Sequence, residues 1–233
     1  YTVTVLEGLA MNGIYAVSYK IPTIMTTIQT IFIQSWQLSA IKEFHSEEGK
    51  RFINKTYIAV QTIMILLCCY TIFFTRILAR LLFQAEFYEA WICVPTLVFY
   101  VLFNTMSGAL GGIFSAVKDT KTFMYTAVVG AITNIILNFI FVWWLGILGA
   151  AISTAISSVV IWGLRLHAAK KYVKIDFLKN NGILQMCLLI IQATVMTVIT
   201  APYGYIIQMF IIACILICNK NEISSWVRSI KRE

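Results

Sequence analysis

Long uncharged stretches alternate with short charged clusters along the chain. Four such stretches follow Lys42, at residues 57–75, 90–117, 122–164 and 180–219. A membrane-spanning helix needs about 20 mostly apolar residues, so the first two stretches predict one span each and the last two predict two spans each. Gly and Pro interrupt helices, and the sequences LGILG (145–149) and APYG (201–204) place them near the middle of the two longer stretches.

Residues 13–36 predict a seventh span, which is rich in Thr, Gln and Tyr and contains Lys20. Residues 1–12 are too short to span, so we expect an outer loop or the remnant of a truncated preceding helix. The predicted fold class is an all-α integral membrane protein of about seven transmembrane helices. We expect spans at about 13–36, 57–75, 91–115, 122–144 and 147–167, two further helices within 182–218, and a tail at 219–233.

Composition supports this class, because 60% of the residues are hydrophobic and only 12% are charged. Soluble domains have about 45–50% apolar and about 25% charged residues. The net charge of +8 does not indicate a nucleic-acid partner, because the basic residues lie in short clusters between apolar stretches, as topology signals do. Membrane lipid is the partner that the composition implies.

The basic residues predict the orientation. Of the 18 Lys and Arg residues, 15 lie on one side of the predicted membrane, two lie on the other side, and Lys20 lies within a span. The positive-inside rule therefore places the C-terminus in the cytoplasm and Tyr1 outside, in a multi-pass protein of the cytoplasmic membrane. A chain that starts outside without a signal peptide is expected to follow earlier spans of a longer polypeptide. Residues 74–89 predict an amphipathic helix in the outer interface, or else an extension of the second span.

One face of the first predicted span is polar. Six polar residues follow one another at sequence spacings of three or four, which at about 100° per residue places them on one face of a helix. Gln29 lies on the flank of this face, and Ile residues lie on the opposite face. The six are Tyr15, Tyr19, Thr23, Thr26, Thr30 and Gln34. This pattern predicts a hydrophilic translocation cavity, or else hydrogen bonds to neighbouring helices.

Lys20 lies at the edge of this face. An ionisable residue within a span is a functional candidate, so Lys20 either faces the cavity or extends its ammonium to the outer surface. Pro22 lacks a backbone donor and is expected to kink or weaken the helix nearby. In the fourth span, Asn134 and Asn138 share a face, and they either line the same cavity or join helices.

No pattern typical of an enzyme is present. The two histidines, His45 and His167, are far apart in predicted loops, and the sequence contains no Gly-rich phosphate loop, zinc pattern or nucleophile elbow. We therefore expect no catalytic residues, no cofactor and no metal.

Four segments of the chain together resemble a known family. GIYAVSYKIP (13–22) and QSWQLSA (34–40) are similar to the GIYSVAYKIP segment and the Q-A-W-x-x-S-A element of bacterial polysaccharide flippases. GIFSAVKDTK (112–121) resembles their cytoplasmic FSALKKTK loop. Asn134 and Asn138, followed by residues 146–151, resemble an N-x-x-x-N helix with a G-x-x-G-A-A turn. Asp119, where a basic residue is common, and Trp143-Trp144, in place of a Pro-containing turn, depart from the family pattern.

The family is part of the multidrug, oligosaccharidyl-lipid and polysaccharide exporter superfamily, whose fold implies two six-helix lobes, often with two extra C-terminal helices. By this resemblance, the chain is the C-terminal lobe plus the two extra helices, and the N-terminal lobe of the same protein is a partner. The implied function is a flippase for lipid-linked oligosaccharides, the repeat units of O-antigen or capsule, which works by alternating access beside polysaccharide polymerase machinery.

The resemblance also implies roles for single residues. Lys20 is expected to pair with the pyrophosphate, while Tyr15 and Tyr19 stack on sugars and Gln29, Gln34, Asn134 and Asn138 bond hydroxyls. Thr23, Thr26 and Thr30 line the same cavity, and Lys118 and Lys121 belong to the cytoplasmic loop. Two rivals remain. A cation-coupled multidrug exporter usually needs a carboxylate within the membrane, and no confident span holds one. The other rival is a non-transporting membrane subunit of a polysaccharide assembly complex.

Overall fold

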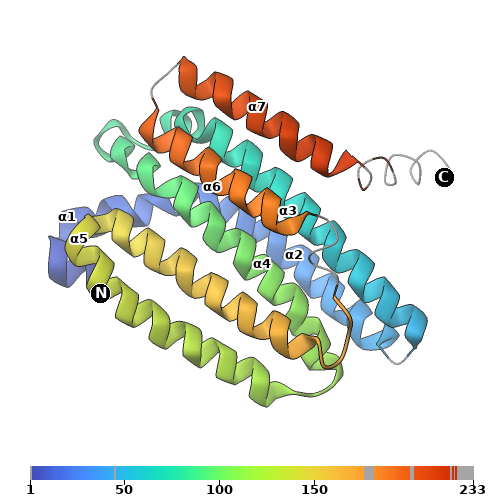
Figure 1. Cartoon of the computed structure of the whole chain (residues 1–233). Coiled ribbons are helices and arrows are strands. Elements are labelled where there is room, and N and C mark those ends of the chain that lie inside the picture. Colours follow the sequence, from blue (N-terminus) through green and yellow to red (C-terminus); the bar gives the residue numbers. More distant parts are fainter. Residues whose placement is uncertain are drawn as a thin grey trace.

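The computed structural model describes residues 2–44, 46–175, 181–199, 202–220, 222 and 224, and this part of the chain consists of helices and short connections, without strands (Figure 1). The elements are α1 (Thr2–Ser18), α2 (Lys20–Glu43), α3 (Glu47–Leu82), the 3₁₀ helix η1 (Ala85–Cys93), α4 (Val94–Ala116), α5 (Thr120–Ala169), α6 (Gly182–Val198) and α7 (Tyr203–Cys218). The predicted all-α fold is confirmed.

Helix α4 lies at the centre of the bundle, where α2, α3 and α5 all pack against it (Figure 1). Its apolar side chains fill the core, and Leu102, Met106 and Leu110 are fully buried. Helix α5 is a hairpin of two arms that meet at Gly146 (φ 56°, ψ −136°). This backbone conformation is essentially restricted to glycine, so the break lies inside the predicted 145–149 segment.

Three helices of the described residues are long and apolar enough to cross a membrane, namely Glu47–Leu82, Ala85–Ala116 and Thr120–Ala169. Shorter apolar helices are Val3–Ser18, Gly182–Val198 and Tyr203–Cys218. Helix α2 is not among them. Its 24 residues reach roughly 36 Å at the usual rise per residue, but its polar side chains lower its hydropathy.

The N-terminal region differs from the prediction of a span at 13–36. Residues 2–12 are helical, with a kink at Gly8 (φ 87°), and the helix breaks at Tyr19 so that residues 13–18 belong to α1. Pro22 has no amide hydrogen to donate to the Ser18 carbonyl. The amide of Tyr19 bonds the Ala16 carbonyl at 3.3 Å, as in a tighter turn, and the Ser18 hydroxyl bonds the Tyr15 carbonyl at 2.6 Å.

Of the two interpretations of residues 74–89, the structure favours an extension of the second span over residues 74–82. Helix α3 continues to Leu82, and η1 follows it. Arg76 is half-buried, because its guanidinium lies 4.6 Å from the centre of the Trp91 ring and donates to the Met196 carbonyl at 3.2 Å. These contacts connect α3 to the end of α6, so the segment forms part of the bundle.

Helices α6 and α7 pack against α3 through buried amides as well as apolar side chains. The side chains of Gln185 and Thr62 both donate to Oδ1 of Asn219, at 3.2 and 3.3 Å. Gln192 donates to the Cys69 carbonyl at 3.0 Å. Hydrogen bonds of this kind join helices where lipid offers no alternative partner.

Candidate functional site

The exposed surface of α2 carries a row of polar side chains. Thr23, Thr27, Thr30 and Gln34 are exposed, and we call these four residues the polar strip. The hydroxyls of Thr27 and Thr30 donate to the backbone carbonyls four residues earlier, at 3.0 and 2.8 Å. Their donor hydrogens are therefore used within the helix, and their oxygen lone pairs remain as acceptors.

The structure changes the membership of the predicted polar face. Thr26 is half-buried and donates to the Thr23 carbonyl at 2.8 Å. Thr27 was missed, although it lies four residues after Thr23 and its helical spacing could have identified it. Thr23, Thr30 and Gln34 are exposed together as predicted.

The same exposed surface has an apolar half. Ile24, Ile28, Ile31 and Phe32 are exposed by 54%, 55%, 66% and 40%, and we call them the apolar strip. At about 100° per residue the two strips run side by side along α2. One helix therefore presents a polar and an apolar surface in parallel, on the side that the bundle leaves uncovered.

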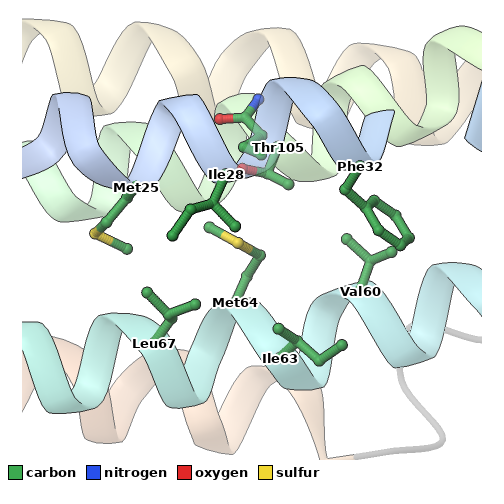
Figure 2. Close-up of a pocket in the computed structure, with 9 residues that line it drawn as sticks. Met25, Ile28, Phe32, Val60, Ile63, Met64, Leu67 and Thr105 are labelled. Carbon is green, nitrogen blue, oxygen red and sulfur yellow. The ribbon is translucent and has the colours of Figure 1, made fainter. Parts of the chain in front are cut away.

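A cleft borders the apolar strip between α2 and α3 (Figure 2). Its volume is about 80 Å³, and Figure 2 shows Met25, Ile28 and Phe32 of α2 facing Val60, Ile63, Met64 and Leu67 of α3. Gln29 also lines it, and its Oε1 is buried with no hydrogen-bond partner among the described residues. The cleft is an apolar notch with one buried amide oxygen.

Tyr15 and Tyr19 lie at the junction of α1 and α2, where the Thr23 amide still donates to the Tyr19 carbonyl at 2.8 Å. Their hydroxyls are 2.9 Å apart, and their rings meet edge to face at 5.2 Å. The Tyr15 hydroxyl also lies 3.3 Å from Oγ1 of Thr154 in the second arm of α5. Both tyrosines are half-buried, whereas Thr23, Thr30 and Gln34 are exposed.

Asn134 and Asn138 join the two arms of α5. Nδ2 of Asn138 donates to the carbonyl and to Oδ1 of Asn134, at 2.9 and 3.0 Å. Nδ2 of Asn134 donates to Oγ of Ser157 at 3.2 Å, and that hydroxyl donates to the Thr154 carbonyl at 2.9 Å. The asparagines are thus connected through Thr154 to Tyr15, and the geometry favours the helix-joining interpretation over free cavity groups.

Lys20 is exposed, and its ammonium donates to the carbonyl of Leu82 at 3.5 Å. Leu82 is the last residue of α3, so the cation lies at the C-terminal end of that helix, where a positive charge is favourable. This geometry favours the interpretation in which the ammonium extends to the outer surface. A role in binding substrate stays a prediction.

Arg165 was counted with the cytoplasmic loop, but it lies within α5 and only 7% of it is exposed. Nε donates to Oγ1 of Thr126 at 3.1 Å, and Nη1 donates to Oγ of Ser107 at 3.0 Å. The guanidinium also lies 3.8 Å from the centre of the Phe123 ring. A buried cation of this kind fixes α4 and both arms of α5 relative to one another.

The predicted loop residues lie in the turn between α4 and α5 and in the first turn of α5. Lys118 and Lys121 are exposed, and Lys118 adopts a positive φ of 58°. Asp119 caps α5, because its Oδ1 accepts from the Thr122 amide at 3.1 Å. Its Oδ2 accepts from the Tyr172 hydroxyl at 2.8 Å. The acidic residue that departs from the family pattern therefore connects this turn to the segment that follows α5.

Parts of the chain are similar in sequence to known proteins. A model of the MatE family matches residues 46–140. Protein DETOXIFICATION 42 of Arabidopsis thaliana is 40% identical over 84 residues, which are 35% of this chain and 16% of that protein. Protein DETOXIFICATION 43 of the same plant is 52% identical over 54 residues, which are 22% of this chain and 10% of that protein.

The arrangement of the helices is similar to a solved structure of the lipid II flippase MurJ in an inward closed conformation. The TM-score is 0.65 at 16% identity, over 97% of this chain and 52% of that one. The chain thus spans about half the length of the flippase and a smaller share of each plant relative. The match at residues 46–140 makes this part of the chain similar to the MatE family, and the fold is shared with a multi-pass membrane protein.

Proposed function

We propose that the chain forms one lobe of a transporter that moves lipid-linked oligosaccharides across the cytoplasmic membrane by alternating access. The observation that carries this proposal is the division of the exposed surface of α2 into a polar strip and an apolar strip. A lipid-linked oligosaccharide has the same division, because a hydrophilic head is attached to a hydrocarbon chain. One helix that presents both surfaces in parallel suits such an amphiphile.

The polar strip suits a sugar head because it is neutral. Threonine hydroxyls and the Gln34 amide offer acceptors and donors to sugar hydroxyls, and no charged residue lies between Thr23 and Gln34. A polar head cannot cross hydrocarbon unaided, because each unpaired polar group costs several kcal/mol there. The strip supplies replacement partners along roughly 17 Å of helix between these two residues.

The apolar strip suits the hydrocarbon chain. Its side chains are exposed next to the cleft between α2 and α3, which is apolar apart from Gln29 and Thr105. The hydrocarbon chain can therefore stay in contact with apolar surface while the head follows the polar strip. In this account the second lobe covers the polar strip and opens to each side of the membrane in turn.

A cation-coupled multidrug exporter is the second candidate, and two observations favour it. The chain is similar in sequence to two DETOXIFICATION proteins, and Glu7 is exposed within α1. The sequence argument against a cation-coupled exporter was that no predicted span contains a carboxylate. Glu7 was not considered there, because residues 1–12 were not expected to belong to a span. Its carboxylate lies 3.7 Å from the position that a Cβ on Gly146 would occupy.

Transport by the intact purified protein in liposomes separates the candidates. A lipid-linked oligosaccharide with a fluorescent sugar is placed in the inner leaflet, and its arrival in the outer leaflet is measured by quenching with a membrane-impermeant reagent. The proposal predicts movement of this lipid well above that in empty liposomes. Movement of a cationic dye driven by a Na⁺ or H⁺ gradient, without movement of the lipid, would instead establish the multidrug exporter.

A further inference from the structure

A cleft with basic walls lies at the start of α3. It has a volume of about 260 Å³ and is lined by Glu47, Lys50, Arg51, Asn54, Val173 and Lys174. The first four residues belong to the first turns of α3, and the last two follow the end of α5. We call this feature the basic cleft, and Figure 1 shows both of its segments at the same end of the bundle.

The charges of the basic cleft are unbalanced. Three of the lining residues are cations and one is a carboxylate. Nζ of Lys50 lies 2.8 Å from Oε1 of Glu47, and within the part of the chain that the structure describes this is the only ion pair shorter than 4.0 Å. Glu47 pairs with Lys50 and also attracts Arg51, so one carboxylate faces three cations and the cleft keeps a net positive charge for an anion. The N-terminus of α3 adds its positive dipole at the same end.

The side chains suit a phosphate group. An Arg guanidinium can bind two phosphate oxygens at once, and a Lys ammonium attracts phosphate as a point charge. The volume is far above the ~10–15 Å³ that a single water molecule requires, so it has space for a phosphodiester with some of its hydration. Arg51 and Lys174 are both exposed and can reach a group that enters from outside.

The position of the cleft indicates where the phosphate comes from. Phe52 follows Arg51 directly, is 45% exposed and packs against Trp36 at a ring distance of 5.9 Å. Charged surface thus changes to apolar surface within one turn of α3, as it does at the headgroup level of a membrane. This end of the bundle carries most of the basic residues, which the positive-inside rule places on the cytoplasmic side. Basic pockets between helices on the cytoplasmic side of a membrane bind anionic headgroups.

We propose that the basic cleft binds the phosphate of an anionic membrane lipid, with Arg51 and Lys174 as the principal cations and the acyl chains directed along the surface at Phe52. The site lies on α3 and the segment after α5, apart from both strips of α2. The inference therefore does not depend on the substrate that the protein transports.

Native mass spectrometry of the intact protein tests the inference, with titrations of phosphatidylglycerol, phosphatidylcholine and inorganic phosphate in detergent. We expect phosphatidylglycerol to bind more tightly than phosphatidylcholine. The double variant Arg51→Gln/Lys174→Gln should lose about fivefold in affinity for phosphatidylglycerol per removed charge. The charge-conserving variant Arg51→Lys/Lys174→Arg should keep most of it.

The matched control is Lys55→Gln/Lys170→Gln, which removes two exposed cations from the same two segments without touching the cleft. The inference requires this control to bind phosphatidylglycerol as the wild type does. An equal loss in both double variants would reduce the effect to general surface charge, and no loss in either would exclude the cleft. If inorganic phosphate displaced phosphatidylglycerol at millimolar concentration, the site would belong to a soluble anion and the lipid assignment would fail.

Discussion

The ammonium of Lys20 and the carbonyl of Leu82 lie 3.5 Å apart and form a hydrogen bond between the start of α2 and the end of α3. This bond holds the cation at the outer edge of the polar strip and opposite the negative end of the α3 dipole. Lys20 therefore connects two helices in the structure, whereas the sequence made it a candidate for binding pyrophosphate.

Replacing Lys20 tests which role applies. Lys20→Met removes the charge and the hydrogen bond, so we expect the free energy of unfolding to fall by about 0.3–1 kcal/mol while the transport rate stays unchanged. Lys20→Arg should retain the stability, because a guanidinium can also reach the Leu82 carbonyl. Chemical denaturation and liposome transport measure the two properties. A stable Lys20→Met variant without transport would restore the pyrophosphate role.

Gly146 makes a separate prediction about the turn of α5. A side chain at φ 56° and ψ −136° is strained, so Gly146→Ala should lower the free energy of unfolding by about 1–3 kcal/mol. The control is Gly163→Ala, because Gly163 is helical and a Cβ there would enter open space; it should be neutral or stabilising by up to about 1 kcal/mol. Thermal unfolding in detergent compares them, and equal melting temperatures would contradict the assigned turn.

The pairing of Asp119 with Thr122 and Tyr172 predicts a pH dependence. Hydrogen bonds to the Asp119 carboxylate lower its pKa. Those from the side chain and amide of Thr122 have the largest effect, and the bond from the Tyr172 hydroxyl has a smaller one. A carboxyl with a lowered pKa in the folded state contributes stability above its unfolded pKa of about 3.9, and this contribution is lost as the pH falls through the lower folded pKa.

The variant Asp119→Ala should therefore melt at a lower temperature than the wild type at pH 7, and the difference should shrink as the pH is lowered below about 4. Melting curves from pH 7 to pH 3 measure this. Tyr172→Phe keeps the bonds from Thr122, so we expect it to lower the melting temperature at pH 7 by less than Asp119→Ala does. A difference that is constant across this range would show that the carboxylate charge has no part in stabilising the turn.

The general architecture could be predicted from the sequence because membrane helices follow from local patterns. Apolar stretches of spanning length identified α3, α4 and the arms of α5, and glycine at 146 marked the turn between those arms. The break at Tyr19 was harder to locate, because residues 13–36 are mostly uncharged and Pro22 signals a disturbance without fixing its position.

The partners of buried polar groups could not be predicted. Arg165 bonds Thr126 and Ser107, which lie 39 and 58 residues earlier, and Tyr15 contacts Thr154 at a separation of 139 residues. No local pattern specifies such pairs, so Arg165 was interpreted as a loop cation because it carries a charge near the end of a span. The periodicity of α2 was sufficient to find three of the four residues in the polar strip, since these share one helix.

The measurement that tests the central claim most directly is the transport of lipid-linked oligosaccharide by the double variant Thr30→Val/Gln34→Leu in liposomes. It keeps the shape of α2 but removes two hydrogen-bonding side chains from the polar strip. The matched control is Thr194→Val, because Thr194 is also exposed and its hydroxyl also donates four residues back, to Ile190 at 2.9 Å. We predict a loss of about tenfold or more for the double variant, since each lost hydrogen bond contributes roughly 1 kcal/mol, and an unchanged rate for the control. Wild-type transport by a folded Thr30→Val/Gln34→Leu variant would contradict the role of the polar strip.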